Sequence, residues 1–302
     1  DWYVGLADND FKEYEIINMA PLPDIVLPSD DEVISELAEP YHLTDDQINF
    51  FKKNGFIKLK NVFSPGAVLK LRAELINLLK KKFKVDPDKE AYDRFLSLEM
   101  IWPDNPLLRA YVLSPRLGQI SANLLEVSAV RLYHDNVLAK QSGCGRTPWH
   151  FDDHHFPLDT NDVVTAWAPA QPTPVEMGPL SFAYPLDVRE LVKDVTFEKT
   201  GTGYDSEVSK IFSKYNVSVN ETPFELGEVS FHHNLNFHTA SRNRTNHSRI
   251  ALANTYYRDG ARVINSPTMV SGDWQKFMPN VKPGDIAASP LNPICWPIKS
   301  KL

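Results

Sequence analysis

The chain has 302 residues, of which 42% are hydrophobic and 24% charged, and its formal net charge is −7. This composition supplies a buried core for one large domain or two small ones. The charge balance is acidic, and no apolar run reaches the roughly 20 residues of a membrane helix, so we expect neither nucleic acid nor a membrane as a partner.

The first 42 residues differ in character from the rest. Residues 1–40 carry eleven acidic residues and one basic residue, Lys12, which leaves the remainder of the chain at +3. The same segment contains four prolines. Such a composition predicts an extended or partly disordered arm over the body of the protein. We therefore expect an N-terminal arm over 1–42 and a single domain over 43–302.

Helix signals dominate from residue 43 to about 128. A capping box, Thr44-Asp-Asp-Gln47, predicts a helix that ends at Gly55. The alternating run 56–60 predicts a half-buried strand. Ser64-Pro65 then begins a leucine-striped helix, and a further helix is expected around 105–125. This part is interpreted as helical support for the core.

Short β-branched and aromatic runs, broken by Gly, Pro and Asn, begin near residue 130. They are typical of an all-β sandwich or barrel. Helices first and strands afterwards predict a mainly β fold with helices packed outside the core. We place the β core at about 129–260 and a C-terminal tail at 261–302.

The stretch "TPWHFDDHHFP" (147–157) holds the first candidate metal ligands. In His150-Phe-Asp152, strand alternation would aim both polar side chains at one ion. With His238 they would form a two-histidine, one-carboxylate facial triad, which leaves one face of a ferrous ion open. Arg249 beyond the triad offers a fork for a carboxylate such as that of 2-oxoglutarate. A polar loop and a zinc hydrolase remain alternatives at this stage.

We interpret the run "GEVSFHHNLNFH" (227–238) as one strand. By parity His232, Asn234, Asn236 and His238 would then share one face. His232 is interpreted as an internal, structural residue. Asp153, next to the candidate ligand Asp152, is expected to point away from the metal.

Several segments together resemble the phytanoyl-CoA dioxygenase (PhyH-like) family. In chain order they are "LTDDQINFFKKNGFIKLKNVFSPGAVLKLRAEL", "PWHFDD", "VVTAWAP", "MGPLSF" and "FHTASRNRTNHSRIAL", and they lie between about 43 and 258. The resemblance implies an oxygenase that depends on Fe(II), 2-oxoglutarate and O2. It also implies a double-stranded β-helix, the cupin-like jelly roll.

The resemblance assigns roles to individual residues. It makes His150, Asp152 and His238 the iron ligands and puts a co-substrate carboxylate on Arg249. It implies further co-substrate contacts for Lys140, Trp167 and Thr165. Asp152 fills the position that halogenating relatives leave to a small residue, which favours oxygen chemistry.

Two departures from the family pattern stand out. Ala240, followed by Ser241, replaces a small hydroxyl residue, which predicts a lost or shifted co-substrate hydrogen bond. Ala183-Tyr184-Pro185 replaces a Gly-Ser-His sequence, which predicts a remodelled loop on the substrate side.

Candidate substrate residues come from parity and from the loop after Asp152. His134 and Asn136 share the predicted face of Lys140, whereas His155 and Phe156 follow the ligand pair into a loop. Arg258 lies nine residues after Arg249, so it would reach the substrate only if its strand bends.

The expected function is oxidation of an unactivated C–H bond of a small, polar or carboxylated metabolite, with succinate and CO2 as co-products. Hydroxylation, desaturation or ring closure, in natural product biosynthesis, would fit. A non-catalytic jelly-roll binding protein and an acyl-CoA hydroxylase are the alternatives. We expect a monomer or weak homo-oligomer. With Cys144 and Cys295 as the only cysteines, we expect an intracellular, cytoplasmic setting, and a removed targeting segment stays open.

Overall fold

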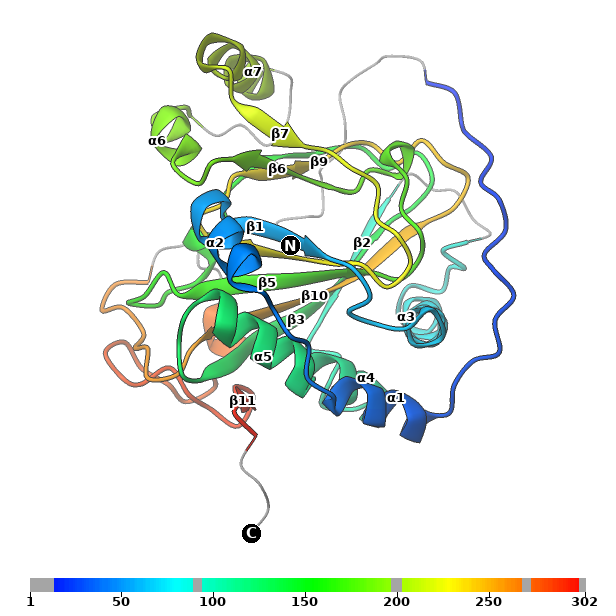
Figure 1. Cartoon of the computed structure of the whole chain (residues 1–302), viewed down its shortest axis with the longest axis horizontal. Coiled ribbons are helices and arrows are strands. Elements are labelled where there is room, and N and C mark those ends of the chain that lie inside the picture. Colours follow the sequence, from blue (N-terminus) through cyan, green and yellow to red (C-terminus); the bar gives the residue numbers. More distant parts are fainter. Residues whose placement is uncertain (1–13, 89–93, 197–202, 268–272, 299–302) are drawn as a thin grey trace.

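Two antiparallel β-sheets form the centre of the computed structural model, which describes residues 14–88, 94–196, 203–267 and 273–298 (Figure 1). The larger, seven-stranded sheet has the order β1-β8-β5-β10-β3-β11, with β2 also paired to β3. The smaller, four-stranded sheet has the order β4-β9-β6-β7. This jelly roll confirms the predicted fold class.

The strands have the following bounds. Those of the larger sheet are β1 (Phe56–Leu59), β2 (Phe95–Glu99), β3 (Val130–Lys140), β5 (Val163–Pro169), β8 (Val229–His233), β10 (Arg249–Arg258) and β11 (Ile294–Trp296). Those of the smaller sheet are β4 (Thr147–His150), β6 (Leu180–Tyr184), β7 (Ser218–Asn220) and β9 (His238–Ala240).

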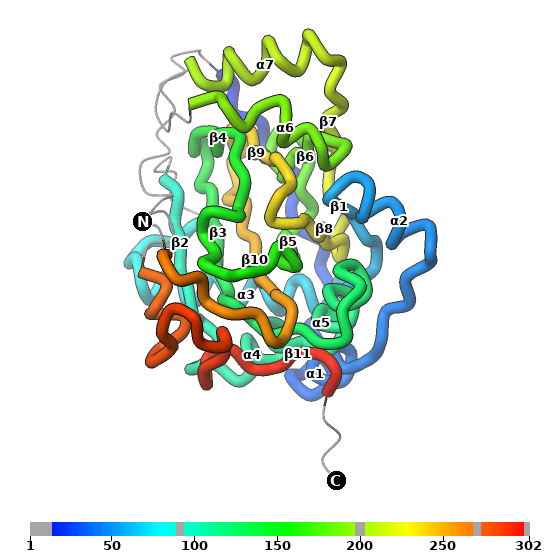
Figure 2. Tube along the Cα trace, turned by 90° about the vertical axis from the view of Figure 1, so that its left-hand side faces the viewer, coloured from blue at the N-terminus to red at the C-terminus, as the bar shows by residue number. Residues whose placement is uncertain are grey.

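Helices cover the outer sides of both sheets, as the edge-on arrangement of Figure 1 and the turned view of Figure 2 show. The main apolar core lies between the larger sheet and α1 to α5, whereas α6 and α7 pack beside the smaller sheet. The α-helices are α1 (Asp30–Ala38), α2 (Asp45–Asn54), α3 (Pro65–Phe83), α4 (Pro106–Val112), α5 (Pro115–Leu124), α6 (Val188–Val192) and α7 (Gly203–Tyr215). The 3₁₀ helices are η1 (Asp153–His155), η2 (Val175–Met177) and η4 (Trp274–Lys276).

The predicted helix starts are confirmed at α2 and α3. Thr44 forms the capping box with Gln47, and Ser64 caps α3 in front of Pro65. The single helix expected around 105–125 is instead two helices. Ser114 caps a new helix with Pro115 at its first position, and a proline inside a continuous helix would lack a backbone donor.

The N-terminal arm is more structured than its composition indicated. Residues 14–28 are extended apart from one bridge, Ile17 to Thr245, but α1 follows. Ser29 caps α1 through a capping box, and the acidic residues in the first turn interact favourably with the positive end of the helix dipole. Val33 and Leu37 are buried in the main core. The composition predicts an extended or partly disordered arm, whereas the acidic residues at the start of α1 stabilise a helix. Residues 1–13 lie outside the described part.

The run 227–238 is not one strand, so the predicted common face is wrong. β8 ends at His233 in the larger sheet, and β9 begins at His238 in the smaller sheet. Between them the chain turns, with the Asn236 amide donating to the His233 carbonyl at 2.8 Å. The Asn236 side chain also donates to the Ala183 carbonyl at 3.1 Å. The chain therefore crosses from one sheet to the other at this point.

The tail after residue 260 forms a second core cluster. Trp274, Phe277 and Met278 pack with Tyr133 and Phe156, and β11 extends the larger sheet beside β3. Both cysteines are buried, and they form no disulfide bond with each other. Among the residues that the structure describes, no helix has the length and apolar character to span a bilayer.

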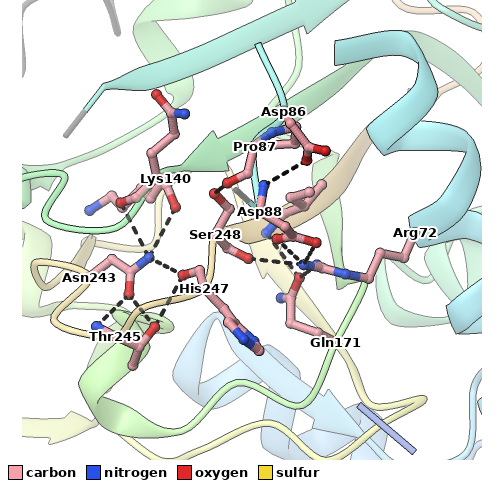
Figure 3. A network of polar contacts seen from close by, with 12 residues as sticks. Arg72, Asp86, Pro87, Asp88, Lys140, Gln171, Asn243, Thr245, His247 and Ser248 are labelled. Carbon is pink, nitrogen blue, oxygen red and sulfur yellow. Dashed lines mark hydrogen bonds and ion pairs between the residues drawn. The ribbon is translucent and has the colours of Figure 1, made fainter. Parts of the chain in front are cut away.

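A buried polar network joins α3 to the start of β10 (Figure 3). Arg72 lies 2.6 Å from the Asp88 carboxylate and donates to the Gln171 side-chain oxygen at 2.5 Å. The same Gln171 oxygen accepts from the Ile250 amide at 3.0 Å. The network therefore fixes the backbone beside Arg249.

We expect Arg72→Met to lower the free energy of unfolding by about 1–3 kcal/mol, because buried acceptors lose a charged donor. Urea unfolding measures this change. The matched control is Lys70→Met on the same helix, whose pair with Asp30 is partly exposed and should contribute less than about 1 kcal/mol. Equal effects of the two substitutions would contradict the prediction.

Candidate metal and co-substrate site

Three buried side chains converge between the two sheets. The ligand atoms of His150, Asp152 and His238 all lie within 4.8 Å of one another. Asp152 Oδ1 is 3.6 Å from His150 Nε2 and 3.8 Å from His238 Nε2. His150 at the end of β4 is the register partner of His238 at the start of β9. The sheet pairing itself therefore brings the two histidines together.

Asp152 reaches the site from a turn and not from the strand. β4 ends at His150, and Asp152 has φ −94° and ψ −13° in front of η1. The amides of Asp152 and Asp153 both donate to the Asn234 carbonyl, at 3.0 and 3.1 Å. Phe151 points to the other side and packs on Phe237. The predicted convergence therefore occurs, although the strand is shorter than expected.

Backbone carbonyls orient both imidazoles. His150 Nδ1 lies 2.8 Å from the Pro148 carbonyl, and His238 Nδ1 lies 3.1 Å from the Asn236 carbonyl. An Nδ1–H that donates to a carbonyl leaves the Nε2 lone pair for a metal. We assign these tautomers from the hydrogen-bond geometry.

The protonation states also suit a metal. Burial lowers the pKa of both His150 and His238, which keeps the rings neutral. Burial alone would raise the pKa of Asp152, but His238, His232 and His150 outweigh it and hold that pKa well below its usual range. The site thus offers two neutral imidazoles and one carboxylate.

Arg249 and Lys140 are cross-strand partners on β10 and β3, and both are buried. Arg249 Nη1 donates to the Gly178 carbonyl at 2.9 Å, and its guanidinium carbon lies 5.2 Å from the centre of the Trp167 ring. Lys140 Nζ donates to the Ala240 and Ser241 carbonyls at 3.0 and 2.9 Å. Two cations side by side fit an anionic ligand.

Trp167 and Thr165 share the inner face of β5, as predicted. Their neighbours Val164, Ala166 and Ala168 belong to the opposite, helix-covered core. The Trp167 Nε1 atom is buried and finds no hydrogen-bond acceptor among the described residues. A buried donor beside Arg249 suits a ligand oxygen. The residues present therefore fit a ferrous ion with a carboxylate co-substrate.

The hydroxyl missing at Ala240 is not supplied by its neighbour. The Ser241 side chain donates to Glu221 at 2.9 Å. Ala240 itself is buried beside Trp167 and Leu180. At this position the chain therefore has an apolar contact where the family has a small hydroxyl residue.

The predicted substrate residues lie in different surroundings. His134 stands against Phe277, with ring centres 4.7 Å apart, and desolvation lowers its pKa to about 4. The Asn136 side-chain oxygen accepts from Ser97 at 2.9 Å. Phe156 packs in the tail cluster, and His155 is half-buried at the end of η1.

Two charged residues near the site point elsewhere. Arg258 is exposed and lies 3.4 Å from Asp162, so its position does not support substrate binding. Arg258 is the last residue of β10 and pairs with Val130. Asp153 pairs with Arg189 at 3.0 Å and lies outside the ligand group. This agrees with the expectation that its side chain points away from the metal position.

Two residues lie close to predicted site residues without having been predicted as contacts. His232, interpreted as internal and structural, has its Nε2 atom 3.3 Å from Asp152 Oδ2. Phe277 comes from the tail, where the sequence shows no motif. Only the inward parity of His232 on β8 could have pointed to the first, and nothing local could have pointed to the second.

Comparisons with known proteins agree with this geometry. The phytanoyl-CoA dioxygenase (PhyH) family model matches residues 51–251. Peroxisomal phytanoyl-CoA dioxygenase from Mus musculus is 24% identical over 234 residues, which are 70% of this chain and 67% of the relative.

Two solved structures share the fold. The alpha ketoglutarate dependent carbocyclase SnoK from nogalamycin biosynthesis has a TM-score of 0.67 at 22% identity, over 85% of this chain and 99% of SnoK. The epimerase SnoN in complex with Fe3+, alpha ketoglutarate and nogalamycin RO has a TM-score of 0.64 at 18% identity, over 83% and 98%.

Proposed function

The chain belongs to the phytanoyl-CoA dioxygenase family, and on this premise we propose that it oxidises a C–H bond of a small organic molecule at iron(II) held by His150, Asp152 and His238. The chain is an iron- and 2-oxoglutarate-dependent oxygenase by family. The assignment of its ligands rests on one observation, the convergence of these three buried donors. Zinc would accept the same three donors, and the family membership favours iron.

When bound, iron with 2-oxoglutarate and O2 supplies the oxidant for the C–H bond, and the co-substrate leaves as succinate and CO2. The protein positions the reactants and excludes water. His150 and His238 keep their Nε2 atoms aimed inward through carbonyl contacts at Nδ1. Arg249 would bind the distal carboxylate of 2-oxoglutarate, with the Trp167 N–H and Thr165 beside it. Lys140 holds the loop after β9 and lies next to Arg249.

The substrate is proposed to bind near His134, Asn136 and His155. A neutral His134 among aromatic rings favours a ligand with a flat or apolar part and a hydrogen-bonding group. With Arg258 in a surface ion pair, a carboxylated substrate has less support than a neutral polar one. The names of the relatives mention phytanoyl-CoA and nogalamycin biosynthesis, so an acyl thioester and a natural product are both worth assaying. An intracellular location remains a prediction.

The test is release of succinate and uptake of O2 with added Fe(II) and 2-oxoglutarate, first without substrate and then with metabolite pools. We expect slow uncoupled turnover that rises with the true substrate. A protein that shows no turnover and no metal-dependent binding of 2-oxoglutarate would be a non-catalytic jelly-roll protein, and the proposal would be wrong.

A further inference from the structure

We propose that His232 is a positioning residue that holds Asp152 as a one-oxygen ligand of the metal; this inference rests on the proposed function. His232 lies on β8 of the larger sheet, while the three ligands come from the smaller sheet and the turn after β4. It thus reaches the metal site from the opposite sheet.

The two oxygens of Asp152 have different neighbours. Oδ1 faces His150 Nε2 and His238 Nε2, at 3.6 and 3.8 Å. Oδ2 lies 3.3 Å from His232 Nε2. One oxygen is thus directed toward the metal position and the other toward a ring N–H. A carboxylate whose second oxygen accepts a hydrogen bond stays monodentate, which keeps the open positions of a facial triad free.

The imidazole ring of His232 has no other hydrogen bond within the described residues. Its Nδ1 atom is buried without a partner. Its ring packs against the rings of His238 and Phe182, with centres 4.5 and 5.7 Å apart. The ring is only 3% exposed, so bulk water does not satisfy it. The geometry therefore indicates that the His232 Nε2–H donates to Asp152 Oδ2.

A fourth metal ligand is the competing role. The group of donors within 4.8 Å of one another contains His150, Asp152 and His238, and His232 is not part of it. Its contact is with the outward oxygen of Asp152. The distances therefore favour support of the ligand over coordination.

The experiment compares His232→Phe and His232→Gln. Phenylalanine keeps a ring among aromatic neighbours but removes the donor, whereas glutamine carries an N–H at similar reach. Cobalt(II) serves as the probe, with affinity measured by titration calorimetry and ligand geometry by its visible absorption. His233→Asn is the control, since that ring lies next in sequence and accepts from the Leu235 amide at 3.2 Å, away from Asp152.

We expect His232→Phe to weaken cobalt binding about 10- to 100-fold and to change the cobalt spectrum, because the Asp152 carboxylate is no longer held in one orientation. Glutamine should restore most of both, and His233→Asn should match the wild type. A Phe variant with wild-type affinity and spectrum would overturn the inference. So would a loss as complete as that of Asp152→Ala that glutamine does not restore, because it would identify a ligand. Wild-type protein that binds no cobalt would instead contradict the proposed function.

Discussion

Asp152→Ala is expected to abolish succinate release and to weaken metal binding by more than about 100-fold, beyond the usual effect of losing an outer partner. Asp152 supplies the only carboxylate of the donor group and is flanked by three buried histidines. Without it, the remaining donor group offers no negative charge to offset that of the metal ion. Titration with cobalt(II) and the succinate assay measure the two losses.

The matched control for this substitution is Asp153→Ala. Asp153 is the next residue and also a carboxylate, but it pairs with Arg189. The control should retain metal affinity and turnover within a few-fold, because its charge does not face the donor group. If Asp152→Ala retained metal affinity, or if Asp153→Ala lost it equally, the ligand assignment would be wrong.

Local signals in the sequence predicted the parts of the fold that local forces determine. Thr44 and Ser64 mark helix starts because their side chains satisfy free amides within three residues. Trp167 and Thr165 were assigned by the resemblance, and alternation along β5 places Trp167 on the face opposite Ala166 and Ala168. His238 and Arg249 could not be chosen by such local signals. They were selected by resemblance to a family, and the structure brings His238 opposite His150.

The division of the run 227–238 between two sheets depends on strand pairing between distant segments, which local alternation does not reveal. The run 227–238 alternates like one strand, yet the chain leaves the larger sheet at His233, and the Asn236 side chain then donates to the Ala183 carbonyl of the other sheet. Parity alone therefore placed His232 and His238 on one strand face, whereas they face each other across the interior, with ring centres 4.5 Å apart. A one-residue change in register reverses every side chain, so such predictions fail wherever a turn intervenes.

Contacts with distant residues also determine the structure near both ends of the described chain, which local sequence signals do not reveal. α1 was hidden in an acidic arm because its burial depends on α4 and the main core, which a composition argument does not contain. The tail cluster likewise depends on Tyr133 and Phe156, more than 100 residues earlier in the chain.

Arg249→Gln is expected to weaken 2-oxoglutarate binding by about 30-fold or more, which corresponds to roughly 2 kcal/mol or more for a buried charge contact. Glutamine keeps a neutral polar side chain at this buried position, but it is shorter and removes the contact that Arg249 Nη1 makes with the Gly178 carbonyl at 2.9 Å. Arg249→Lys should fall between, since lysine keeps the charge but not the two-pronged donor geometry. Calorimetry of 2-oxoglutarate binding to the metal-loaded protein measures the effect.

Arg258→Ala is the control, because Arg258 lies on the same strand but forms an exposed ion pair with Asp162. It should leave co-substrate affinity unchanged. Cobalt affinity without 2-oxoglutarate should be the same in all these variants, because Arg249 is not a member of the donor group. This separation matters, since a general loss of folding would lower both affinities together. Unchanged 2-oxoglutarate affinity in Arg249→Gln would show that another cation, with Lys140 the first candidate from its register opposite Arg249, binds the carboxylate.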